Sequence, residues 1–155
     1  MWNKKLLLFV FVIWICACSG QVSNEPEEPI MEFETILHYG LQWHISVYES
    51  GYAHREVDDW DINMQPESKL YHLGPDQIRS LKKAVELAQF FDLPEQIDPE
   101  TIRTDEDLLW IKVYKGNHSK QVIAIGLDRA INPDFAERFL ILWKTMISII
   151  PEPER

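Results

Sequence analysis

Cysteine, positive charge and long apolar runs are all scarce in this 155-residue sequence. The two cysteines are Cys16 and Cys18, so the chain after residue 18 can form no disulfide and can use no thiol as a nucleophile. Lys and Arg number 15 against 25 Asp and Glu, and the formal net charge is −10 at pH 7. Because a phosphate backbone requires clustered basic side chains, this balance argues against a nucleic-acid partner.

Motifs of common enzyme classes are also lacking. The six glycines are dispersed, so they form neither a phosphate-binding loop nor a G-x-S-x-G element. The adjacent acids Asp105, Glu106 and Asp107 precede a predicted strand, and we interpret them as solubilising charges rather than as a catalytic pair. We therefore expect no enzymatic activity and no cofactor.

The first residues contain a short apolar run from Leu6 to Ala17, preceded by Asn3, Lys4 and Lys5. A membrane-crossing helix needs about 20 apolar residues, whereas a charged start and a short apolar run are typical of a signal peptide. Alternatives are an uncleaved short anchor and a plain secretory signal.

The stretch Ile15-Cys16-Ala17-Cys18 resembles the lipobox of bacterial lipoproteins. That resemblance implies that residues 1–17 are a signal peptide, cleaved between Ala17 and Cys18, and that Cys18 carries diacylglycerol and palmitate-type chains. Two or three acyl chains hold a protein firmly on a membrane without a spanning helix. The implied location is the cell envelope, on the outside of the cytoplasmic membrane. In a host with two membranes, Ser19 after the lipidated position favours the outer one.

Residues 18–31 comprise the lipidated cysteine and a polar stretch, "SGQVSNEPEEPIM", whose composition predicts a flexible acidic tether. Loss of Lys4 and Lys5 with the signal peptide makes the remaining chain still more acidic. We expect this chain to stand away from anionic lipid headgroups.

A period of two in the apolar residues predicts three antiparallel strands between Glu32 and Val57. Residues 58–68 are expected to form a loop, followed by a short extended piece from Lys69 to His72. The sequence Gly74-Pro75-Asp76 predicts the start of a helix, which ends at "FFDLP".

Residues 94–106 are expected to be an acidic loop, followed by a hairpin formed by "DLLWIKVY" and "SKQVIAIGL". Asn132-Pro133-Asp134 predicts a closing helix that stops before Pro151. The order βββ-α-ββ-α predicts one α+β domain over residues 32–150, with an antiparallel sheet and both helices packed on it, and a disordered tail at 151–155.

The apolar positions of these elements predict a covered core. We expect Trp43, Trp110 and Trp143 to be buried. In the last strand Val122 and Ala124 alternate with Ile123 and Ile125, which suggests that both faces of the sheet are covered.

Four aromatic residues are candidates for partner binding. Trp60 lies between Asp59 and Asp61 in a predicted loop, where an exposed tryptophan is a common binding anchor. The alternative is that the loop tucks Trp60 back onto the domain. Tyr39, Tyr48 and Tyr52 lie near the first hairpin turns and would extend the surface.

Weak metal-site candidates are Asp59, Asp61 and Asn63, which match the first three ligand positions of a calcium loop. Met64 and Leu70 stand where such a loop needs Gly and Glu, so we interpret the segment as a solvated acidic loop. The histidines lack the spacing of a zinc motif; they are His38, His44, His54, His72 and His118.

Three segments, "LKKAVELAQFFDLPE", "DEDLLWIKVYKGN" and "NPDFAERFLILWKTMISII", resemble a pattern shared by small bacterial domains. These domains include uncharacterised lipoproteins and the emfourin-type inhibitors of thermolysin-like metalloproteases. The resemblance covers roughly residues 32–150, and its motifs determine the fold rather than the function. The first hairpin has a single glycine, Gly40, where those inhibitors usually carry a pair. We therefore carry over no binding residues from the inhibitors to this chain.

We therefore expect a monomeric, membrane-anchored envelope lipoprotein whose domain binds a protein or peptide without catalysis. A partner strand would add to a free sheet edge beside the first hairpin. The alternatives are a proteinaceous inhibitor of an extracytoplasmic hydrolase or protease, and a metal-binding protein or metal-dependent enzyme.

Overall fold

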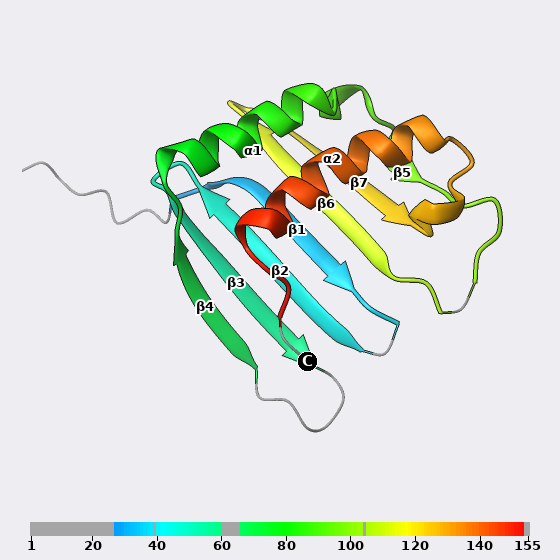
Figure 1. Ribbon diagram of the computed structural model, residues 1–155, viewed down its shortest axis with the longest axis horizontal. Coiled ribbons are helices and arrows are strands. Elements are labelled where there is room, and N and C mark those ends of the chain that lie inside the picture. Colours follow the sequence, from blue (N-terminus) through cyan, green and yellow to red (C-terminus); the bar gives the residue numbers. More distant parts are fainter. Residues whose placement is uncertain (1–26, 39, 60–65, 104, 154–155) are drawn as a thin grey trace, which may run out of the picture.

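The computed structural model describes residues 27–38, 40–59, 66–103 and 105–153. One mixed, seven-stranded sheet carries both helices on the same face, which confirms the α+β class (Figure 1). The strands are β1 (Pro29–Ile36), β2 (Leu41–Tyr48), β3 (Tyr52–Asp59), β4 (Glu67–His72), β5 (Gln96–Ile97), β6 (Leu108–Lys115) and β7 (His118–Ile125). The helices are α1 (Pro75–Leu87) and α2 (Pro133–Ile149), with short 3₁₀ turns at Phe90–Asp92 and Leu127–Arg129.

The strand order in the sheet is β4-β3-β2-β1-β6-β7-β5, so the first hairpin lies in the middle. Phe33 of β1 pairs with Ile45 of β2 on one side and with Ile111 of β6 on the other. All neighbours are antiparallel except β5, whose two residues pair in parallel with Ile123 and Ala124 of β7.

The predicted order βββ-α-ββ-α is wrong in two places. The extended piece expected at Lys69–His72 is a full strand, β4, which begins at Glu67 and pairs with β3. The segment expected to be an acidic loop contains β5, which is too short to show a period. The first strand also begins at Pro29 rather than at Glu32.

Both helices begin where the sequence predicts. Pro75 occupies the first turn of α1, and the Gln77 side chain accepts a hydrogen bond from the Gly74 backbone N–H at 2.8 Å. The Asn132 side chain accepts a hydrogen bond from the Asp134 N–H at 3.1 Å and so caps α2.

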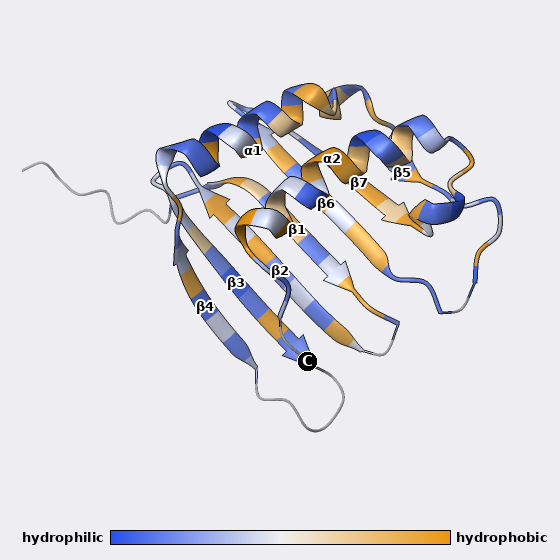
Figure 2. Ribbon diagram, in the orientation of Figure 1, coloured by the Kyte–Doolittle hydropathy of each residue, from blue (hydrophilic) through white to orange (hydrophobic). Residues whose placement is uncertain are grey.

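The core lies between the helix layer and the sheet. Trp143 of α2 packs against Phe33 and Trp43, with ring centroids 6.3 Å and 5.5 Å apart. Arg138 of α2 donates hydrogen bonds to the Ala88 and Gln89 carbonyl oxygens and so ties α2 to the end of α1. Figure 2 shows hydrophobic and hydrophilic residues alternating along the strands, as expected for a sheet with one covered face.

A buried cation, Arg55, lies on the helix side of the sheet, next to the outer strands that the helices leave uncovered. Arg55 of β3 is 4 % exposed and points to the helix side, where it donates to the Pro151 carbonyl oxygen at 2.6 Å and to Glu67 at 2.9 Å. Its guanidinium also lies over the Tyr71 ring, 5.5 Å from the centroid. Arg55 therefore joins the chain after α2 to the outer strands.

Candidate functional site

The candidate site is the sheet face opposite the helices, which we call the open face. In the part of the chain that the structure describes, both helices lie on the other side, and no element covers this one (Figure 1). Its side chains alternate with the buried ones along each strand; in β2 they are Gln42, His44, Ser46 and Tyr48.

The middle of the open face holds a cluster that we call the polar centre, formed by Glu32, Glu34, His44, Lys112 and Tyr114. His44 Nδ1 lies 3.3 Å from Glu34 Oε2, and His44 Nε2 lies 3.6 Å from Glu32 Oε1. Tyr114 donates a hydrogen bond to Glu32 Oε2, and Lys112 Nζ lies 3.9 Å from the same oxygen. Because the two carboxylates are only 19 % and 14 % exposed, the cluster is a packed network rather than a set of solvated charges.

Two groups of the polar centre have shifted proton affinities. Burial raises the pKa of Tyr114 above its ordinary value, and the hydrogen bond to Glu32 adds to the shift. The pKa of Lys112 is also raised, first by its interaction with Tyr114 and further by the charge on Glu32. Both shifts extend to higher pH the range in which Tyr114 and Lys112 keep their protons.

Beside the polar centre runs an apolar row across β1, β6 and β7. Trp110 is opposite Ile123, and Leu108 is opposite both Ile36 and Ile125. The Trp110 ring contacts the His44 ring at 5.6 Å between centroids, so the row and the polar centre form one surface. Ile36 is 37 % exposed, and the other four residues are partly exposed.

The apolar row corrects two expectations about the core. Trp43 and Trp143 are buried as predicted, but Trp110 is not: it lies on the open face. Ile123 and Ile125 share that face, so the expectation that both faces are covered is wrong for the residues that the structure describes. The period of two in β6 does separate Trp110 from buried Ile111 and Val113, and this was the signal that sequence reasoning missed.

Two of the three predicted tyrosines, Tyr48 and Tyr52, lie in the described part of the chain. Tyr48 and Tyr52 flank the β2–β3 turn, and the Tyr52 ring contacts the His72 ring at 5.3 Å. The β1–β2 turn lies at the opposite end of β2, so Tyr48 is separated from the residues that flank position 39 by the length of this strand. Tyr39 and Trp60 themselves lie outside the described residues.

The free edges are also not where they were expected. β1 and β2 are paired on both sides, so the first hairpin has no free edge, and that prediction is wrong. Among the described strands the outer ones are β4 and β5, and the exposed β4 carries the charges of Glu67 and Lys69. Charged residues on an edge strand oppose uncontrolled pairing.

For the metal candidates, Asp59 is the last residue of β3, and Asp61 and Asn63 lie outside the described residues. The histidines have other neighbours: His38 Nδ1 lies 3.2 Å from Asp107, and His54 Nε2 lies 2.7 Å from the Ser68 hydroxyl. Within the described ranges, no group of three or more His, Cys, Asp or Glu side chains is placed to hold a metal ion.

The lipobox residues Ala17 and Cys18 precede the described part of the chain. Neither helix in that described part is long and apolar enough to cross a bilayer.

Comparison of the chain with known protein families and with curated proteins gives no match in either.

Proposed function

We propose that this protein is a membrane-anchored lipoprotein of the cell envelope whose domain binds a protein or peptide on its open face. Acyl chains on Cys18 hold the processed chain at the membrane, and the stretch before β1 links them to the sheet. The sequence order of charged start, short apolar run and lipobox supports the anchor.

The observation that carries the binding function is the uncovered apolar row next to the polar centre. Contiguous apolar side chains on a surface mark interaction sites, and tryptophan is enriched among the residues that dominate binding energy. Trp110 lies between Glu34 and Ile123 in its row of the sheet and contacts His44. A partner that covers Trp110 would bury an apolar surface with polar groups already in fixed positions beside it, which lowers the entropic cost of binding.

An apolar row spread across three strands fits a folded protein or an extended peptide better than a small molecule, because small-molecule sites are concave. The neighbouring carboxylates, Glu32 and Glu34, already have side-chain partners within the polar centre. We therefore infer a partner surface dominated by apolar side chains.

The test is photo-crosslinking in living cells of the host. A benzophenone amino acid is placed at Ile123 on the open face and, as a matched control, at Leu87 of α1, which is 60 % exposed on the helix layer. The proposal predicts a discrete crosslinked product from position 123 and none from position 87. Equal products from both positions, or none from position 123, would refute it.

The anchor is tested separately with Cys18→Ala. We expect this variant to remain unlipidated and to leave the membrane fraction or accumulate unprocessed. A processed Cys18→Ala product that still fractionates with membranes would contradict lipid anchoring.

A further inference from the structure

A second site lies within the fold, at the end of the sheet where β1 and β7 finish and β2 and β6 begin. A cavity of about 490 Å³ opens there between the strand ends, α2 and the segment that precedes β6. Its size falls in the range of small-molecule sites, about 300–1,000 Å³. It lies among the helix-side residues and shares none of its lining with the open face.

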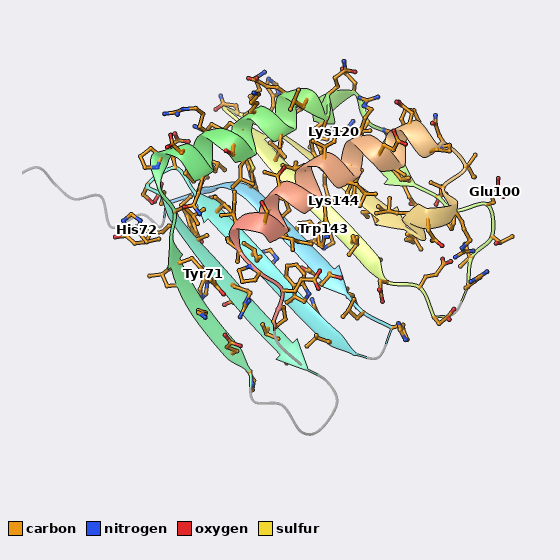
Figure 3. All side chains as sticks on the ribbon, viewed as in Figure 1. Tyr71, His72, Glu100, Lys120, Trp143 and Lys144 are labelled. Atoms are coloured by element: carbon orange, nitrogen blue, oxygen red, sulfur yellow. The ribbon has the colours of Figure 1, made fainter. Side chains whose placement is uncertain are left out.

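Apolar side chains lie at the inner end of the cavity, whose lining as a whole is more polar. Trp43 and Trp143 line it, and both are almost completely buried. Leu109 adds an aliphatic wall. In Figure 3, Trp143 is labelled between α2 and the sheet. This wall can hold an aliphatic or aromatic portion of a ligand.

The outer wall is ionic and partly buried. The Glu106 side chain is only 8 % exposed and forms an ion pair with Arg129. Arg129 is held in turn by the Thr101 carbonyl oxygen at 2.8 Å and the Thr101 hydroxyl at 3.0 Å. Its Nε lies 3.6 Å from Asp128, too far for a hydrogen bond, and this buried N–H has no hydrogen-bond partner among the described residues.

Two buried acceptor groups of this cavity lack a hydrogen-bond donor in the described part of the chain. They are the Thr35 hydroxyl, in a residue only 1 % exposed, and the Glu106 carboxylate, whose ion pair with Arg129 leaves both oxygens without a hydrogen bond in that part. Buried polar atoms are normally hydrogen-bonded, and a buried atom without a hydrogen bond costs free energy even where, as at Glu106, the charge itself is paired. Because both groups line one cavity, a ligand that supplies donors would satisfy them together.

The lining of the cavity carries more negative than positive groups, which favours a cationic ligand. Five carboxylates face two guanidinium groups around the cavity. An ammonium group has three donors and no acceptor, which complements both the negative charge and the unpaired acceptors. A ligand with its own carboxylate or phosphate would be repelled.

We propose that this cavity binds a protonated aliphatic amine, with its stem against Trp43 and Trp143 and its ammonium group beside Glu106 and Thr35. The amine can belong to a free small molecule or to a lysine side chain. This site is independent of the open face, and each can fail without the other.

The test is calorimetric titration of the full-length protein in neutral detergent micelles at pH 7. The probes are n-pentylamine, 1-pentanol and hexanoate, which share a pentyl stem and differ in charge. The proposal predicts saturable binding of n-pentylamine and no binding of the other two. Absence of n-pentylamine binding at millimolar concentration, or equal binding of 1-pentanol, would overturn it.

Variants locate the site. Glu106→Gln removes the carboxylate charge with little change of shape and should weaken n-pentylamine binding at least about tenfold, as expected for loss of a charged hydrogen-bond partner. Thr35→Val should weaken it several-fold, whereas Glu137→Gln, at an exposed site of α2, should leave it unchanged. An unchanged affinity in Glu106→Gln would refute the assignment.

A measurement on the unmodified protein guards against misfolded variants. The indole N–H resonances of Trp43 and Trp143 should shift on titration with n-pentylamine, and that of Trp110 should not. Shifts confined to Trp110 would place the amine elsewhere and refute the proposal. Nα-Acetyl-L-lysine methylamide, which keeps the side-chain ammonium group, is titrated in parallel to distinguish the sources. Binding of both probes indicates a lysine side chain as an acceptable ligand, and binding of n-pentylamine alone indicates a free amine.

Discussion

Replacing Glu67 by Gln should destabilise the protein by about 2 kcal/mol, because it removes the only carboxylate paired with the buried Arg55 guanidinium in the described structure. The Arg55 side chain is 5 % exposed, whereas Glu67 is 47 % exposed. Removing one partner of a fully buried pair costs about 3–5 kcal/mol, and the partial exposure of Glu67 reduces that figure.

Arg55→Met should cost about 1–2 kcal/mol, less than the loss of two charged hydrogen bonds would suggest. Methionine keeps the apolar stem over Tyr71 and abolishes the cost of burying a cation, although the Pro151 carbonyl oxygen then loses its donor. The double variant should be about as stable as Arg55→Met alone, because Glu67 has nothing to pair with once the guanidinium is gone.

The assay is urea unfolding monitored by tryptophan fluorescence. The slope of the free energy of unfolding against urea concentration is compared between variants as a check on two-state behaviour. A matched control is Glu137→Gln, an exposed carboxylate without an ion pair in the described structure, which should change stability by less than about 0.5 kcal/mol. A Glu67→Gln effect as small as the control, or additive single effects in the double variant, would refute the account of Arg55.

Three further predictions concern the polar centre, the core and a turn. Because the pKa of Tyr114 is raised in the folded state, its contribution to stability is complete below the ordinary tyrosine pKa and is lost as pH rises through the higher folded value. Tyr114→Phe should therefore show a shallower loss of stability above about pH 10 in urea unfolding at several pH values, and an unchanged slope would contradict this. Trp143→Ala should lower the free energy of unfolding by about 3–5 kcal/mol, whereas Trp110→Ala should lower it clearly less, since Trp110 is only partly buried. Thermal unfolding that ranks the two variants in the reverse order would contradict the assigned faces. Gly126→Ala should lower the free energy of unfolding by at least about 1 kcal/mol in the same assay. Gly126 has φ of +53°, and a Cβ there would lie 3.0 Å from Glu106 Oε1 and from Pro99 Cβ. An unchanged stability would contradict the turn geometry.

Local signals explain why much of the fold was predictable from sequence. Pro75 and the Asn132 cap act within one turn of chain, so they identify both helix starts. The period of two in β2 arises from burial on one face and needs no knowledge of neighbours. These features are encoded in adjacent residues.

The sheet order was not predictable in the same way, because it depends on pairing between distant segments. The contact of β1 with β6 joins Met31–Ile36 to Leu108–Val113 and leaves no local trace in either strand. Among the described strands, the two residues of β5 pair with β7 alone, and a strand of that length has no measurable period.

Burial of individual charges likewise depends on distant partners. Glu106 stands in an acidic run, yet Arg129 and the 3₁₀ turn around it shield its side chain. Arg55 occupies an apolar position of its strand and is buried because Pro151 and Glu67 supply acceptors. The alternation of residues along β6 distinguishes the two faces of the strand. It does not show which face the helices cover, because that depends on the packing of the whole domain.

The central claim is that partners bind on the open face, and the most direct test is the affinity of the partner captured by crosslinking from position 123. Its dissociation constant should be measured with the unmodified protein, with Trp110→Ala and with Leu87→Ala as the surface control. We predict that Trp110→Ala weakens binding by at least about 30-fold, as for a residue that dominates an interface, and that Leu87→Ala changes it by less than about twofold. Equal affinities for Trp110→Ala and the unmodified protein would contradict the claim.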